Sequence, residues 1–115
     1  MLFVCYPKCT TCQKAKRYLE AKGADFTERH IKDEKPSEEE LRQWHAVSGL
    51  PLKKFFNTSG LQYKALSLKD KLPAMSEEEQ FALLASDGML VKRPILVGED
   101  YVFVGFKEAQ WEEKM

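Results

Sequence analysis

The sequence predicts an α/β fold with one mixed sheet, built from a βαβ unit, an inserted helical segment and a ββα unit. Short apolar runs of β-forming residues lie near both ends of the chain, at 2–6 and 94–104. The stretch between, about 35–88, carries only helical signals. A chain of 115 residues is long enough for one domain with one core. We place that core at about 1–34 and 89–115.

The N-terminal part of the chain predicts a strand, a helix and a second strand. Residues 2–6 form a continuous apolar run, typical of a buried strand. Apolar side chains then recur with helical spacing from 9 to 22, and Gly23 is placed to end that helix. Residues 25–31 contain a second β-rich run. A βαβ unit of this size makes the two strands parallel.

The middle of the chain predicts helices throughout. Ser37 and Ser76 each begin a Ser-Glu-Glu-Glu sequence, the pattern of a capping box. We expect Gly49 and Gly88 to end the two helices that begin at these sequences. Between them, we expect several short helices over 51–73. The expected apolar faces are Leu41, Trp44 and Val47 in the first helix, and Phe81, Leu84 and Ala85 in the second.

The C-terminal part predicts a hairpin and a last short helix. Two apolar runs, 94–97 and 101–104, lie on either side of Gly-Glu-Asp at 98–100. Trp111 is the expected anchor of a helix over 107–114. A βαβ unit followed by ββα is the element order of a thioredoxin-like fold.

Composition narrows the function classes. Lysine plus arginine equals aspartate plus glutamate at 18 each, so there is no global attraction to nucleic acid or an anionic membrane. The N-terminus lacks a basic start, and no apolar stretch approaches about 18 residues, so we expect neither a secretory signal nor a membrane helix. Three cysteines are too few for a disulfide scaffold. We therefore expect a cytoplasmic protein. We also expect a monomer, since nothing in the sequence argues strongly against one.

The candidate site is the pair Cys9 and Cys12, at the junction of the first strand and the first helix. Unpaired N–H groups and the macrodipole at a helix N-terminus favour a thiolate, and Lys8 and Lys14 add positive charge. We expect Cys9, the more exposed thiol, to be the nucleophile and Cys12 to resolve the mixed disulfide. The neighbours expected to form the rest of the site are Lys8, Thr10, Thr11 and Pro94.

Two other interpretations of the pair remain open. A structural zinc site needs about four ligands, and beyond the pair the chain offers Cys5, His30 and His45 without ligand spacing. The pair could also be buried and inert. Redox chemistry is favoured over both because of the strand-to-helix position.

Arg93 and Pro94 form the second part of the candidate site. In a thioredoxin-like fold the loop before the hairpin faces the cysteine pair. A cis peptide at Pro94 fits that loop, since cis bonds are essentially confined to proline. Arg93 then places a fixed positive charge near the thiolate or a bound oxyanion.

These residues resemble the arsenate reductase/Spx family. The similarity lies in Tyr-Pro-Lys-Cys-Thr-Thr-Cys-Gln-Lys-Ala at 6–15, Arg-His-Ile at 29–31, Met-Leu-Val-Lys-Arg-Pro-Ile at 89–95 and Val-Gly-Phe at 104–106. The resemblance implies a thioredoxin-like core with a helical insertion, a cis Pro94 and a cytoplasmic, mostly bacterial setting.

The family implies two functions. Its glutaredoxin-linked arsenate reductases use one catalytic cysteine, which here would be Cys9, and three anion-binding arginines. Of the three arginines this chain has only Arg93. Asn57 and Gly105-Phe106 stand where the other two are expected. We therefore expect a thiol-dependent oxidoreductase with no bound cofactor and a poor arsenate pocket, served by glutathione/glutaredoxin or thioredoxin. The alternative is an Spx-type regulator, in which the pair is a redox switch and the partner is the C-terminal domain of the RNA polymerase α-subunit.

Overall fold

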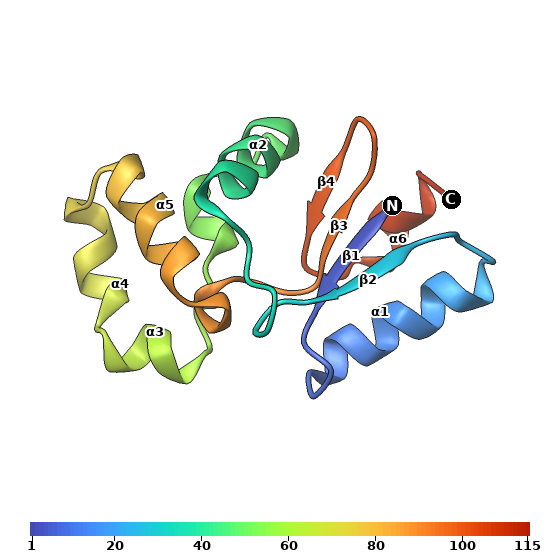
Figure 1. The fold of residues 1–115 in the computed structure, drawn as a ribbon, viewed down its shortest axis with the longest axis horizontal. Coiled ribbons are helices and arrows are strands. Elements are labelled where there is room, and N and C mark those ends of the chain that lie inside the picture. The colour runs from blue at the N-terminus through green and yellow to red at the C-terminus, as the bar shows by residue number, and fades with distance from the viewer.

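The computed structural model describes residues 1–115 and contains a single four-stranded mixed sheet in the order β2-β1-β3-β4 (Figure 1). The strands are β1 (Leu2–Cys5), β2 (Thr27–His30), β3 (Ile95–Val97) and β4 (Val102–Val104). β1 pairs with β2 in parallel, and β3 pairs antiparallel with both β1 and β4. The predicted α/β class, the parallel βαβ unit and the terminal hairpin are confirmed.

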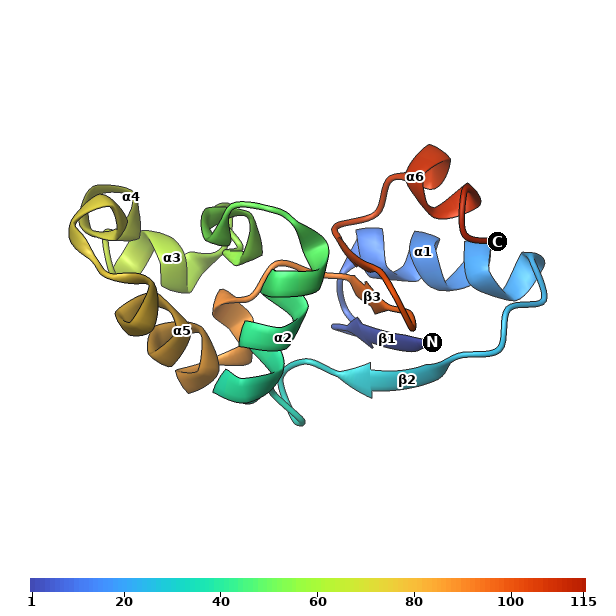
Figure 2. The same ribbon diagram turned by 90° about the horizontal axis from the view of Figure 1, so that it is seen from above.

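Helices cover both faces of the sheet (Figures 1 and 2). They are α1 (Thr10–Ala21), α2 (Glu38–Ser48), α3 (Leu61–Ala65), α4 (Leu68–Lys71), α5 (Glu77–Ser86) and α6 (Glu108–Glu112), with 3₁₀ turns η1 (Leu52–Phe55), η2 (Leu72–Ala74) and η3 (Gly88–Leu90). In Figure 1, α2 lies to the upper left of the strands, whereas α1 and α6 lie to the lower right and right of them. No helix is both long and apolar enough to cross a bilayer.

Strand alternation divides the buried side chains into two cores. Phe3 and Cys5 of β1 face α1 and α6, where Trp111 is fully buried. Val4, between them, faces the opposite side and joins the larger core shared with α2 and the helical segment. The members of that larger core include Leu41, Trp44, Phe55, Phe56, Phe81, Leu84, Ile95 and Val102.

Local end signals produce the expected helix boundaries. The side chains of Ser37 and Ser76 accept hydrogen bonds from the N–H groups three residues later, completing both capping boxes. Gly49 follows α2 in the left-handed region, with φ of 69°. Gly23, with φ of 68°, follows α1.

Two details of the helical segment differ from prediction. Val47 is 52% exposed, because each three-residue step turns the helix by about 300° and leaves Val47 roughly 120° round from Leu41. Gly88 does not end α5, which stops at Ser86. It is buried against the backbone of Ile31, where an added Cβ would lie 1.9 Å from the carbonyl oxygen. Close backbone approach, rather than a left-handed turn, explains this glycine.

Candidate functional site

Cys9 is the N-cap residue of α1, held by a turn that leaves β1. Its backbone is extended, and its N–H donates to the Tyr6 carbonyl at 3.0 Å. Its own carbonyl accepts from Gln13 N–H at 3.0 Å, which begins the helix. Cys9 is half-buried, whereas Cys12, one turn further on, is only 2% exposed. The two thiols of the motif therefore differ in access to a substrate.

The electrostatics around Cys9 favour a thiolate. Burial alone would raise its pKa, but backbone N–H groups of Cys12 and Thr11, the Cys12 thiol and the Arg93 guanidinium outweigh burial and lower the pKa below 9.0. The N–H groups at the N-terminus of α1 are therefore among the causes that lower this pKa. The cation that lowers this pKa is Arg93, rather than Lys8 or Lys14, whose side chains are exposed.

Cys12 has the opposite character. Burial raises the pKa of its thiol to about 12, and the neighbouring Cys9 adds to that rise. The Tyr6 N–H donates to its sulfur at 3.4 Å and holds it beneath the turn. A protonated, shielded thiol is a poor first nucleophile, but a proton donor to Cys9 and a second nucleophile once Cys9 is derivatised.

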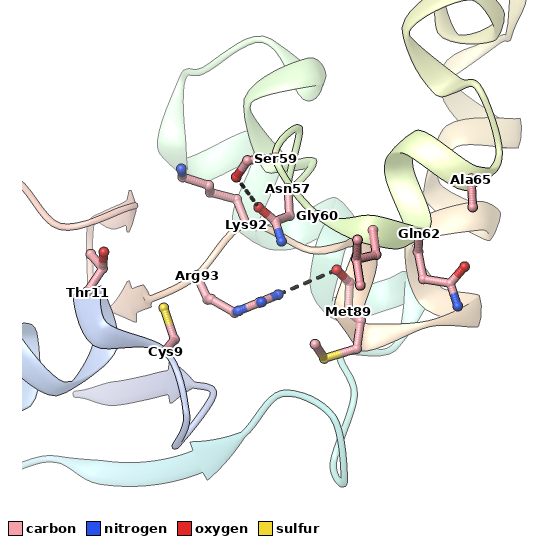
Figure 3. Close-up of a pocket in the computed structure, with 11 residues that line it drawn as sticks. Cys9, Thr11, Asn57, Ser59, Gly60, Gln62, Ala65, Met89, Lys92 and Arg93 are labelled. Carbon is pink, nitrogen blue, oxygen red and sulfur yellow. Dashed lines mark hydrogen bonds between the residues drawn. The ribbon is translucent and has the colours of Figure 1, made fainter.

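Arg93 reaches the site from the loop before β3. The Arg93–Pro94 peptide bond is cis. The guanidinium lies over the Tyr6 ring, 5.1 Å from its centroid, and Nη1 donates to the Met89 carbonyl at 3.4 Å. In Figure 3 the side chain extends between Cys9 and Met89.

Cys9 and Arg93 line a pocket of about 640 Å³ (Figure 3). The lining residues are Cys9, Thr11, Asn57, Ser59, Gly60, Leu61, Gln62, Ala65, Met89, Lys92 and Arg93. Of the residues predicted from the sequence, Cys9, Thr11 and Arg93 line it. Cys12 and Pro94 are buried, and Lys8 and Thr10 are exposed outside it.

The far wall of the pocket comes from the helical segment. Two backbone hydrogen bonds connect residues 55–57 of this segment to the chain before Arg93. The Asn57 N–H donates to Leu90 O and the Lys92 N–H donates to Phe55 O, both at 2.7 Å. The residues that sequence reasoning did not assign to the site are Ser59, Gly60, Leu61, Gln62, Ala65, Met89 and Lys92. The local signals for them were the Asn-Thr-Ser-Gly turn at 57–60, which does not show what the turn faces, and the stretch 89–95, from which only Arg93 and Pro94 had been assigned to the site.

The third cysteine lies outside the pocket. Cys5 is buried and donates to Glu28 Oε2 at 3.4 Å, and burial together with this carboxylate raises the pKa of its thiol to about 12. His45, one of the two histidines considered as zinc ligands, packs against the rings of Phe55 and Phe81. Nowhere are three His, Cys, Asp or Glu side chains gathered into a group that could hold a metal ion.

A Cys-x-x-Cys motif at a helix N-terminus, facing a cis-proline loop, defines a thioredoxin-fold thiol protein. The model of the ArsC family matches residues 5–114, and the chain therefore belongs to the ArsC family. The resemblance to the arsenate reductase/Spx family is confirmed.

Relatives and solved structures agree with this assignment. YusI of Bacillus subtilis is 57% identical over 113 residues, covering 98% of this chain and 96% of the relative. The regulatory protein MgsR of the same organism is 31% identical over 110 residues, covering 96% and 86%. An ArsC family related protein from Bacteroides fragilis has a TM-score of 0.97 at 56% identity, covering 99% and 96%. The thioredoxin-like fold and the family-level redox assignment are thus confirmed.

Proposed function

We propose that this protein is a thiol–disulfide oxidoreductase in which Cys9 attacks and Cys12 resolves. The observation that carries the proposal is the contrast between the two thiols. Cys9 is accessible in the pocket with a lowered pKa, and Cys12 is buried behind it with a raised one. Arg93 supports the assignment because its charge stabilises the thiolate.

The proposed reaction transfers two electrons from the pair to a disulfide. The Cys9 thiolate attacks one sulfur of the substrate, forming a mixed disulfide and expelling the other sulfur as a thiolate, which takes a proton from solvent. Cys12 then attacks the Cys9 sulfur, and its proton passes to the departing substrate sulfur. This step closes a Cys9–Cys12 disulfide and releases the second substrate thiol.

A thiol reductant must then restore the pair. ArsC-like arsenate reductases use such reductants, and glutathione with glutaredoxin, or thioredoxin, has the chemistry to reduce this disulfide. We place the protein in the cytoplasm, where thiols are kept reduced. Arsenate is a weaker candidate substrate, because Arg93 is the only arginine of the pocket and Asn57 is neutral.

The test is reduction of a small disulfide by wild type, Cys9→Ser and Cys12→Ser. We expect Cys9→Ser to abolish turnover and Cys12→Ser to accumulate a mixed disulfide on Cys9, detected by intact mass. Cys5→Ala removes a buried thiol outside the pocket and is the matched control, expected to keep turnover. Full activity in Cys9→Ser would show that another group is the nucleophile.

A second function is favoured by the 31% identity to the regulator MgsR. In this proposal the pair is a redox switch, and oxidation changes affinity for the C-terminal domain of the RNA polymerase α-subunit. A pull-down with the purified domain, using oxidised and reduced protein, tests it. Binding that depends on the pair supports a regulator, and no binding in either state excludes one of this type.

A further inference from the structure

The Cys9 pocket contains a second positive charge besides the one that stabilises the Cys9 thiolate. Lys92 and Arg93 both line it, and none of the eleven lining residues is Asp or Glu. The chain as a whole has a formal net charge of zero, so this is a local concentration of charge. A pocket with this balance favours a ligand that carries negative charge.

The two cations serve different parts of the pocket. Arg93 is next to Cys9, stacked on Tyr6, and lowers the pKa of that thiol. Lys92 takes part in none of the ion pairs of the structure. Figure 3 shows the Lys92 and Arg93 side chains extending in different directions from the chain before β3. Lys92 is therefore an unpaired cation in the wall of the pocket.

The backbone holds Lys92 in place. Its N–H donates to Phe55 O at 2.7 Å, which fixes its position in the chain before β3. Its Cε lies 3.6 Å from the place where a Cβ on Gly105 would be, so the stem lies close to this glycine. The backbone of Lys92 is thus fixed, and its half-buried side chain forms no ion pair.

The size and lining of the pocket indicate a ligand larger than an oxyanion. A volume of about 640 Å³ lies within the range of roughly 300–1,000 Å³ typical of small-molecule sites. Leu61, Ala65 and Met89 give it an apolar side, and Leu61 is 86% exposed at that wall. A single tetrahedral anion beside Cys9 would leave this apolar wall unused.

We propose that Lys92 binds an acidic group of a low-molecular-weight disulfide whose sulfur reacts with Cys9. The inference rests on the proposed function and deepens it by naming the substrate class. Cys9 forms a bond to the nearer sulfur, and the other half of the disulfide leaves as a thiolate that solvent protonates. Lys92 takes no part in that exchange. It selects acidic disulfides over neutral ones.

The experiment uses Cys12→Ser as a trap and follows labelling of Cys9 by intact mass at low ionic strength. The probes are dithiodipropionic acid, which carries two carboxylates, and the neutral hydroxyethyl disulfide. Lys92→Gln is compared with Lys64→Gln, an exposed lysine on α3 that does not line the pocket. Because the ratio of the two rates is compared between variants, intrinsic differences between the probes cancel.

We expect Lys92→Gln to lower the acidic-to-neutral rate ratio about tenfold, equivalent to about 1.4 kcal/mol, through a loss of binding. Lys64→Gln should leave the ratio unchanged, and the pH midpoint of Cys9 alkylation should be the same in both variants. An unchanged ratio in Lys92→Gln, or an equal fall in both rates, overturns this inference and leaves the proposed function in place. If neither probe labels Cys9, the proposed function fails and this inference fails with it.

Discussion

Replacing Glu40 with glutamine is expected to weaken the joint between the sheet and the helical segment. Arg29 of β2 donates Nη1 to Glu40 Oε2 at 2.6 Å and Nη2 to Oε1 at 2.9 Å. The same carboxylate accepts from the Ser37 N–H at 3.0 Å, at the N-terminus of α2. The hydrogen bonds from Arg29, with a smaller contribution from Ser37, lower the pKa of Glu40 to about 2.

The size of the effect follows from linkage. A fall in pKa from 4.5 to about 2 is worth at most about 3.4 kcal/mol, at about 1.36 kcal/mol per pH unit. The Glu40 side chain is 33% exposed, and solvent screening reduces this to about 1.5 kcal/mol. Because the folded-state pKa is depressed, the stabilisation is complete above about pH 5 and is lost as pH falls toward 2.

Urea unfolding, followed by the fluorescence of Trp44 and Trp111, measures this effect. At pH 7 we expect Glu40→Gln to be less stable than wild type by about 1.5 kcal/mol, with the gap narrowing between pH 5 and pH 3. Glu39→Gln, at an exposed residue in the same helical turn, should change stability by less than about 0.5 kcal/mol. Equal losses in the two variants, or a gap that does not depend on pH, would refute the reasoning.

Two further predictions concern the site and the core. Arg93→Met should raise the pKa of Cys9, moving the midpoint of its alkylation rate to higher pH, because a cation beside the thiolate is lost. Lys14→Met should not move that midpoint, and an equal shift in both would contradict the role given to Arg93. Gly88→Ala should destabilise the protein by about 1–3 kcal/mol in thermal unfolding, since its Cβ would lie 1.9 Å from Ile31 O. An unchanged melting temperature would contradict that close approach.

Features that depend on a few neighbouring residues were predictable from the sequence. The capping boxes at Ser37 and Ser76 are examples, because each is closed by a residue three positions later. The position of Cys9 at a helix N-terminus is another, since it follows from a strand running into a helical pattern. The left-handed Gly49 likewise needs only its own helix.

Features that depend on long-range packing could not be predicted in the same way. Gly88 resembles a helix-ending glycine in the sequence, and only the approach of Ile31 shows its role. The charges near Cys9 show the same limit: Lys8 and Lys14 are close in the sequence, but the cation that acts on the thiol is Arg93. The loop that a thioredoxin-like fold places opposite the pair indicated that arginine, whereas Lys92 of the same loop was assigned to the site only from the pocket.

The backbone hydrogen bonds joining residues 55–57 to 90–92 hold together two separate parts of the pocket. Cys9, which carries the reacting sulfur, lies at the junction of β1 and α1. Arg93, the cation beside it, directly follows residues 90–92 in the chain. Most of the residues that line the pocket lie in 57–65, the segment that continues from residues 55–57. The stretch between residues 55–57 and 90–92 contains neither Cys9 nor Arg93, but it contributes Phe81 and Leu84 to the core, so an exchanged stretch must keep those core side chains. Grafting that stretch between members of the fold is a direct route to altered substrate preference with the same thiol chemistry.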